Sequence, residues 1–301
     1  PIHPLPTIEA GPDVTICAGD FISLSAGGGA AYRWLLTPGN VYRPKRAASR
    51  TDEHFYLVGN NGGDWATYWR NTFGSQSPIE KFNIAGYRTV CVMPGTTRPW
   101  PEGAFFGYSR IYTQPAFGYR GPGFGWSAMP DQFVLDFVRR RELENRRRPL
   151  FIEIVLGNSH APFHVLPPFL ADWSRIGDGT VFQGLEPLVF PVTWSDMTHA
   201  AEAYIAALTY DFKVILGFIE QFVKDDALVI IMGDHQPNVQ VTGPGRPWSV
   251  PVHVMSRNRA FLEPFRRRHY TPGIFPSQPL PHERMAHVLT NLFADFSPPP
   301  D

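Results

Sequence analysis

An acid and an imidazole stand side by side in the motif Gly-Asp-His-Gln-Pro at residues 233–237, as Asp234 and His235. Carboxylate oxygen and imidazole nitrogen together suit a divalent cation such as zinc or manganese. The same residues are also typical of a turn, in which Asp234 caps a following helix and His235 only faces solvent. Two ligands fall short of the three or four of a usual metal site, so the motif alone leaves both interpretations open.

Two apolar runs predict the strands that would position this chemistry. The run at residues 227–232 is rich in branched side chains and ends at Gly233, which favours a central strand covered on both faces. The run at 150–157 predicts another buried strand, and His160 follows its end. Ligands of open α/β sheets bind beyond the carboxyl ends of such strands. His160 is therefore a candidate for the same cleft, although a lone histidine is more often structural.

A long helix is predicted between these strands, from residue 195 to about residue 223. A strand, a helix and a second strand in this order form a right-handed crossover whose strands are parallel. The fold class is therefore α/β, with a mainly parallel central sheet flanked by helices. The buried helix face is predicted to consist of Met197, Ala200, Ala201, Tyr204, Ile205, Leu208, Phe212, Ile215, Leu216, Ile219, Phe222 and Val223.

Further elements follow from the same patterns. Strands are predicted at 86–93 and 250–255, and helices after Pro130 and at 282–296. His253 lies within the last strand, where it either reaches the cleft or is buried. The arginine-rich end of the helix after Pro130 also contains Glu142, and this mixture of charges predicts a solvated helix end. The aromatic loop at 100–126 either forms the wall of a pocket or pins a long loop to the core.

Composition excludes several classes of protein. Among 301 residues, 27 Lys and Arg balance 27 Asp and Glu, so no net charge points to nucleic acid. A content of 43% hydrophobic residues excludes a disordered chain, while 31 Pro and 27 Gly indicate long loops. Cys17 and Cys91 form no disulfide framework. No run approaches the roughly 20 apolar residues of a membrane span, so we expect a soluble portion of a processed or longer protein.

The chain divides by pattern near residue 80. Residues 1–80 are rich in glycine loops, with alternation at 14–17 and 21–25 that indicates an irregular or small β-rich segment. Residues 81–301 carry the α/β pattern, and we expect them to form an α/β domain.

A series of short motifs resembles one enzyme family. They are Ser-His-Ala-Pro at 159–162, Asp-Trp at 172–173 followed by Gly-Asp-Gly at 177–179, Gly-Asp-His-Gln-Pro at 233–237, Val-Thr-Gly at 241–243 and Val-Pro-Val-His-Val at 250–254. Segments at 86–90, 121–126 and 129–132 extend the likeness upstream. In this order, over about residues 82–296, they resemble the sulfatase-like membrane proteins of the alkaline phosphatase superfamily. Relatives include sulfatases, phosphoethanolamine transferases and lipoteichoic acid synthases.

The resemblance implies a metal-dependent hydrolase or transferase for phosphate or sulfate esters, with residues 81–301 as the C-terminal part of its α/β catalytic domain. Asp234 and His235 would bind a divalent metal ion (manganese, zinc or calcium), and His160 would lie near the phosphoryl or sulfuryl group. His253 matches a later histidine of some relatives. The implied substrate is a small-molecule, lipid or glycan ester, with no nucleic acid. The implied location is the extracytoplasmic face of a bacterial membrane, with membrane anchoring through segments outside this chain.

The amino-terminal half of the family's site does not match. Relatives place an acidic ligand and a Thr, Ser or formylglycine nucleophile well before the segment at 86–90. Thr72 is the nucleophile candidate here, beside Thr67 and Ser77, and Asp64 is the candidate for the acidic ligand. An alternative therefore stays open, namely a pseudoenzyme or incomplete family member that binds a glycan or a protein partner.

Overall fold

The computed structural model describes residues 32–33, 45–46, 78–100, 103–144, 146–223, 227–246, 249–268, 270–274 and 279. The chain divides into two compact units, Pro1–Gly74 and Ser75–Asp301. In the first unit, β1 (Tyr32–Arg33) pairs antiparallel with β2 (Lys45–Arg46). The strands predicted at 14–17 and 21–25, and the helix predicted at 282–296, lie outside the described residues.

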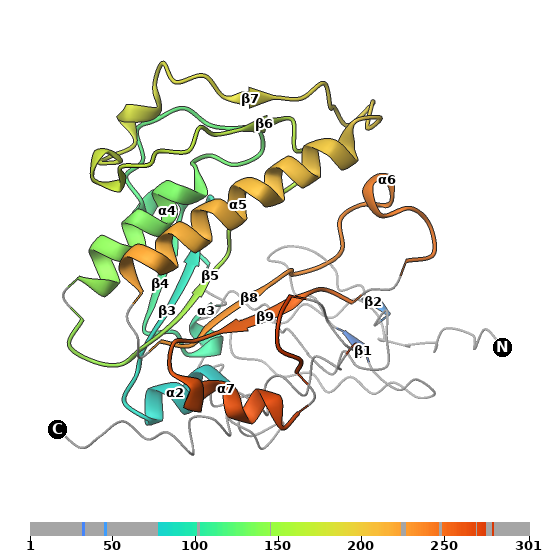
Figure 1. Ribbon diagram of the computed structural model, residues 1–301. Helices are drawn as coiled ribbons and strands as arrows, with labels where there is room; N and C mark the ends of the chain where they lie inside the picture. The colour runs from blue at the N-terminus through green and yellow to red at the C-terminus, as the bar shows by residue number, and fades with distance from the viewer. Residues whose placement is uncertain are drawn as a thin grey trace, which may run out of the picture. The chain divides into compact units, whose positions relative to one another are not determined.

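The second unit is built on a parallel sheet in the order β4-β3-β5 (Figure 1). Its strands are β3 (Arg88–Met93), β4 (Arg110–Thr113) and β5 (Leu150–Ile154), and β3 pairs in parallel with both neighbours. The centre of β3 is buried because it carries small and branched apolar side chains, with Val90, Cys91 and Val92 at most 1% exposed. The predicted α/β class and the strand at 86–93 are confirmed. A strand is also found in the run at 150–157, but it ends at Ile154 and is half-buried rather than buried.

Two helices cover one face of this sheet (Figure 1). They are α4 (Asp131–Val138), which continues into a π-helical turn at Arg139–Leu143, and α5 (Ala200–Phe222). Phe133 and Phe137 of α4 and Val214 and Phe218 of α5 belong to one hydrophobic core with β3. Burial of such side chains stabilises the fold by roughly 1.5–3 kcal/mol each.

The long helix differs from its prediction in two ways. It begins at Ala200 because the Asp196 carboxylate accepts hydrogen bonds from the amide and hydroxyl of Thr198, which holds the preceding residues in a turn. Its buried face is also narrower and rotated, since Ile205 and Leu216 are 64% and 45% exposed. The buried positions are Ala200, Ala203, Ala207, Tyr210, Asp211, Val214 and Phe218.

The predicted crossover is wrong in its strand pairing. β8 (Val229–Met232) pairs antiparallel with β9 (Val252–Met255), and no described strand pairing joins β8 to β5. The amide of Gly233 donates to the carbonyl of Pro251 at 3.4 Å, which extends this two-stranded ribbon beyond Met232. Because a ribbon of two strands offers less cover than a central sheet, β8 is half-buried and Met232 is 46% exposed.

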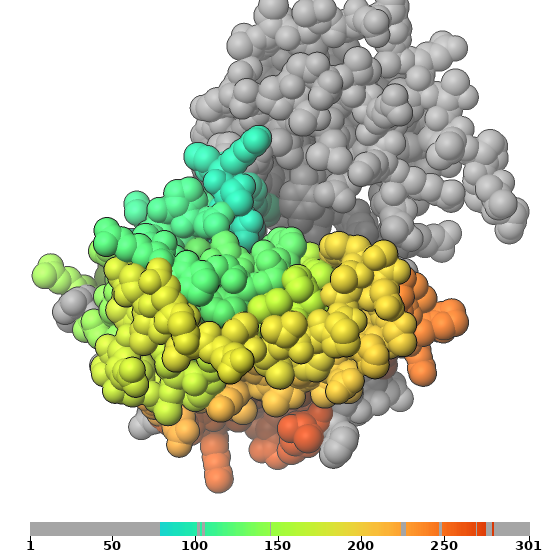
Figure 2. Space-filling model, turned by 90° about the horizontal axis from the view of Figure 1, so that it is seen from above, coloured from blue at the N-terminus to red at the C-terminus, as the bar shows by residue number. Residues whose placement is uncertain are grey.

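Shorter elements complete the unit. The ribbon of β6 (Val165–Leu166) and β7 (Leu188–Val189) follows β5, and the segment around β7 lies at the surface in yellow in Figure 2. Leu188 and Val189 are accordingly 55% and 63% exposed. No helix in the described residues is long and apolar enough to cross a membrane. The other helices are α2 (Pro78–Ile84), α3 (Gly103–Phe106), α6 (Val239–Thr242) and α7 (Arg259–Arg266), with 3₁₀ turns at Gln114–Ala116, Trp173–Arg175 and Thr180–Phe182.

The arginine-rich end of α4 is not simply solvated. The Glu142 side chain is 2% exposed and forms an ion pair with Arg88, from the start of β3, at 2.6 Å. Arg88 donates two hydrogen bonds to this carboxylate, and Tyr112 of β4 donates a third at 2.6 Å. Burial alone would raise the pKa of Glu142, but the bonds from Arg88 and Tyr112 outweigh it and hold this pKa below its usual value. Glu142 therefore ties α4 to the central sheet.

Candidate functional site

Asp234 and His235 lie just past the end of β8, with their side chains 81% and 70% exposed. The Nδ1 atom of His235 lies 2.8 Å from the carbonyl of Gln236, and beside a carbonyl oxygen this nitrogen carries the proton. The lone pair is then on Nε2, which lies 3.5 Å from Oδ2 of Asp234. A histidine held by its other ring nitrogen in this way has the usual arrangement of a metal ligand.

The donor atoms of this pair fit a divalent cation. Two ligands that each stand about 2.1 Å from one ion at a tetrahedral angle are about 3.4 Å apart. The observed separation of 3.5 Å between Nε2 and Oδ2 agrees with such a shared ion. Within the part of the chain that the structure describes, no three His, Cys, Asp or Glu side chains are grouped so that they could hold a metal ion together. Asp234 and His235 therefore fit one half of a metal site.

His160 lies in a turn that follows β5. Its amide donates to the carbonyl of Gly157 at 3.2 Å, which closes the turn. Its ring stacks on Trp126, with centroids 3.8 Å apart and planes 17° from parallel. Its Nδ1 lies 2.7 Å from the carbonyl of Ala161, so Nε2 is the ring nitrogen that no described contact engages. The exposed ring is thus held with one nitrogen available for a ligand.

The N-terminal half of α5 joins the two loops. Phe163, just past His160, and Val241 of α6, just past His235, both pack with the small residues Ala200, Ala203 and Ala207. Tyr204 contacts the Phe163 ring at 5.1 Å. Burial raises the pKa of Tyr204, and the negative charges of Asp211 and Asp234 raise it further. The structure therefore brings both predicted loops onto one helix, although their strands do not pair.

The remaining predicted site residues lie elsewhere or outside the description. His253 is half-buried in the middle of β9, where its ring contacts Phe212 of α5 edge to face at 6.1 Å. Asp64, Thr67, Thr72 and Ser77 lie outside the described residues.

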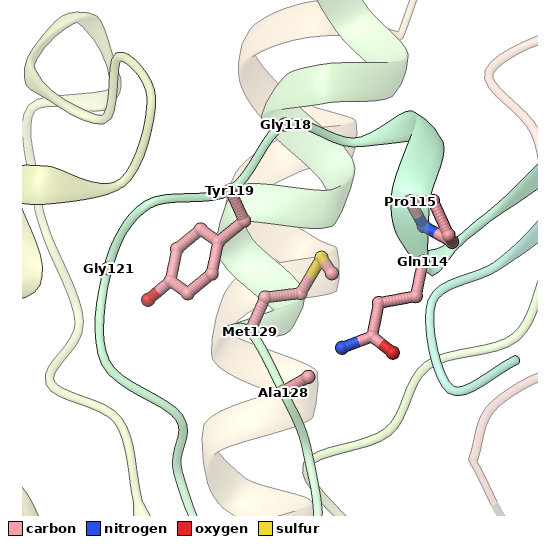
Figure 3. Close-up of a pocket in the computed structure, with 7 residues that line it drawn as sticks. All are labelled: Gln114, Pro115, Gly118, Tyr119, Gly121, Ala128 and Met129. Atoms are coloured by element: carbon pink, nitrogen blue, oxygen red, sulfur yellow. The ribbon is translucent and has the colours of Figure 1, made fainter. Parts of the chain in front are cut away.

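The aromatic loop contributes both to the core and to a small pocket. Phe117 and Phe124 are buried in the core, as the pinning interpretation expects. Tyr119 instead lines a pocket of about 290 Å³ (Figure 3). The other lining residues are Gln114, Pro115, Gly118, Gly121, Ala128 and Met129. None of these residues is Asp234, His235 or His160, so the pocket is not the candidate site.

Trp126 was missed by sequence reasoning as a partner of His160. No local pattern in the sequence links the two rings, whereas the structure shows that Gly95 and Gly157 both pass close to the indole. A Cβ at Gly95 would come within 2.7 Å of the indole, and one at Gly157 within 3.6 Å. These glycines leave the space that the ring occupies.

Replacing Gly95 by alanine is expected to displace Trp126 and to disrupt its stacking on His160. The indole is 48% exposed, so it can move outward at a stability cost of about 1 kcal/mol or less. The measurement is the proton NMR shift of the His160 ring, which loses its upfield displacement when the indole moves away. Gly123→Ala is the control, since the nearest atom to its added Cβ is 3.6 Å away. An unchanged His160 shift in Gly95→Ala would contradict the stacking arrangement.

Comparison with known proteins decides the family. The family model described as Sulfatase matches residues 53–269, which is most of the chain. The chain belongs to the sulfatase family. The match includes the turn with His160 and the pair Asp234 and His235, and the resemblance seen in the sequence is confirmed. It begins at residue 53, so it also includes Asp64 and Thr72, within the segment predicted to be a separate irregular module.

Two solved structures resemble this sulfatase-family chain. The lipoteichoic acid synthase LtaP from Listeria monocytogenes is 15% identical, with a TM-score of 0.42 over 67% of this chain and 55% of its own. A protein in the alkaline phosphatase superfamily from Vibrio parahaemolyticus is 14% identical, with a TM-score of 0.39 over 62% of this chain and 43% of its own. The chain thus spans about half the length of these proteins. A search of curated proteins gave no match.

Proposed function

We propose that the chain is the catalytic part of a divalent-metal-dependent hydrolase or transferase for phosphate or sulfate esters. The observation that carries this proposal is the pair Asp234 and His235. Its Nε2 and Oδ2 atoms are 3.5 Å apart, and the other imidazole nitrogen is held by a backbone carbonyl. Membership of the sulfatase family supports the reaction class.

Asp234 and His235 would hold the cation, manganese, zinc or calcium. When bound, such an ion polarises an ester oxygen and lowers the pKa of a coordinated hydroxyl. His160 would bind the ester through Nε2, because its Nδ1 is engaged by the Ala161 carbonyl. In its protonated form, Nε2–H donates to a phosphoryl or sulfuryl oxygen, or to the leaving oxygen. Stacking on Trp126 restrains the plane of the His160 ring.

The nucleophile and the acidic ligand are assigned to the upstream part of the family match. Thr72 is proposed as the nucleophile and Asp64 as the further ligand, on the grounds of residue type and of their place within residues 53–269. The substrate is proposed to be a lipid, glycan or small-molecule ester at the extracytoplasmic face of a membrane.

A second candidate function rests on the incomplete ligand set. The described residues supply two donors, Asp234 and His235, where a catalytic metal site uses three or more. We propose as the alternative a pseudoenzyme or incomplete family member that binds a glycan or a protein partner.

Metal removal distinguishes the two functions. The protein is dialysed against EDTA and reloaded with manganese, zinc or calcium. Turnover of aryl phosphate monoesters, diesters and sulfates is then measured. The enzyme is expected to lose turnover of one ester class with the metal and to regain it on reloading. Retention of less than stoichiometric metal by elemental analysis, with no turnover of any ester, would establish the pseudoenzyme instead.

A further inference from the structure

A buried carboxylate holds the turn that carries His160. Asp131, the first residue of α4, is fully buried. Its Oδ1 accepts the amide of Gly157 at 2.8 Å, and its Oδ2 accepts the amide of Asn158 at 2.8 Å. The Asn158 side chain returns a bond, because its Oδ1 accepts the Asp131 amide at 2.6 Å. Both oxygens of Asp131 are thus bonded to the backbone of the turn.

A second buried acid, Asp211 of α5, lies beneath the same turn. It is 6% exposed, and its Oδ1 is a buried atom without a hydrogen-bond partner among the described residues. Its pKa responds to the Asp131 carboxyl and to Ser159. No basic side chain in the described residues forms an ion pair with either acid. The titratable neighbours are Tyr204 and Tyr210. Burial raises the pKa of both, Asp211 raises that of Tyr204 further, and Asp131 and Asp211 raise that of Tyr210 further. Two buried carboxyls in contact cannot both ionise, so one proton is shared.

The hydrogen bonds indicate which acid carries this proton. Asp131 accepts two amide hydrogens, which favours its ionised form, so Asp211 is the protonated member and donates to it. Burial raises the pKa of Asp131 to about 6. Burial also raises the pKa of Asp211, well above its usual value, and the charge of Asp131 raises it further. Asp131 is therefore the ionised member of the two buried acids, and Asp211 is the protonated member.

We propose that Asp131 and Asp211 are a proton-sharing pair of positioning residues that hold His160 for the reaction. The proposal rests on the proposed function, in which His160 binds the ester. Asp131 fixes the backbone of Gly157 and Asn158 through its two hydrogen bonds, and the His160 amide donates to the carbonyl of Gly157. Asp211 acts on the turn through Asp131. A displacement of the reacting group by about 1 Å costs on the order of 100-fold in rate. The pair therefore acts on kcat through His160.

Two isosteric variants test the assignment of the proton. Asp211→Asn keeps a donor toward Asp131, so kcat is expected to stay within about threefold of the parent. Asp131→Asn places an amide NH₂ against the amide of Gly157 or Asn158, and kcat is expected to fall about 100-fold with KM little changed. The His160 ring, followed by NMR, is expected to lose its Trp126-induced upfield shift only in Asp131→Asn.

The NMR result needs no turnover, so it separates this proposal from the proposed function. Loss of metal-dependent turnover in the parent protein would overturn the function, whereas an unmoved His160 ring in Asp131→Asn would overturn the positioning role. Equal damage by both variants would overturn the proton assignment. If Asp131→Asn does not fold, Ser159→Ala removes the hydroxyl that contacts Asp211. It is expected to shift the His160 resonance and lower kcat severalfold, and an unchanged resonance would contradict the proposal.

Discussion

Asp234→Ala is expected to remove the divalent cation and to lower ester turnover by at least about 100-fold. Loss of groups that only support metal ligands already costs 10–100-fold, and loss of a ligand itself costs more. The folded state is expected to be unchanged, because the Asp234 side chain is 81% exposed and its described bonds are to its neighbour His235. The measurements are bound metal by elemental analysis and turnover of the preferred ester.

Glu186→Ala is the matched control for this variant. Glu186 is an exposed acid after the last 3₁₀ turn, so its removal changes net charge equally without touching the pair. It is expected to retain full metal and full turnover. Stoichiometric metal in Asp234→Ala would show that the ion is bound elsewhere and would refute the ligand role of Asp234.

Arg88→Met is expected to destabilise the folded protein by about 3 kcal/mol at pH 7. It leaves the Glu142 carboxylate, which is 2% exposed, without its cationic partner, while the hydrogen bond from Tyr112 remains. Breaking a buried pair typically costs 3–5 kcal/mol, and we place this one at the low end because Arg88 itself is 37% exposed. Urea unfolding at pH 7 measures the change in free energy.

The pH dependence of this loss has a definite sign. In the parent, the pKa of Glu142 lies below its unfolded value of 4.5, so the pair contributes stability above that pH and loses it as pH falls through the folded pKa. In Arg88→Met, burial without the arginine raises this pKa, so protonation relieves the cost as the pH falls. The difference in the free energy of unfolding between the parent and Arg88→Met is therefore expected to shrink as the pH falls toward 4.5.

Two further variants check that burial is the cause. Adding Glu142→Gln to Arg88→Met removes the unpaired charge and is expected to restore more than half of the lost stability. Arg267→Met breaks the exposed pair with Glu263, at 3.2 Å, and is expected to change stability by about 0.5 kcal/mol or less. Equal losses in Arg88→Met and Arg267→Met would refute a special role for the buried carboxylate.

Much of the site could be predicted from local patterns. Asp234, His235 and His160 each follow an apolar run, and the structure places each of them just past β8 or β5. Trp126 and Asp211 were not predicted as parts of the site. The available signal for Asp211 was its charge, because it is an acid that follows Tyr210 on the buried face of α5. A Trp between glycine-rich turns carries no comparable signal, because its partner His160 lies in another element.

The sequence by itself determined the family, the α/β class and the donor atoms offered at the ends of β5 and β8. These follow from the order of motifs and from apolar runs broken by glycine and proline, which are local properties of the chain. Only the tertiary structure decided that β8 pairs with β9, that Glu142 is buried against Arg88 at a separation of 54 residues, and that Asp131 and Asp211 meet beneath His160. Strand pairing and the burial of a charge depend on which distant segment covers it, and no local pattern encodes that partner.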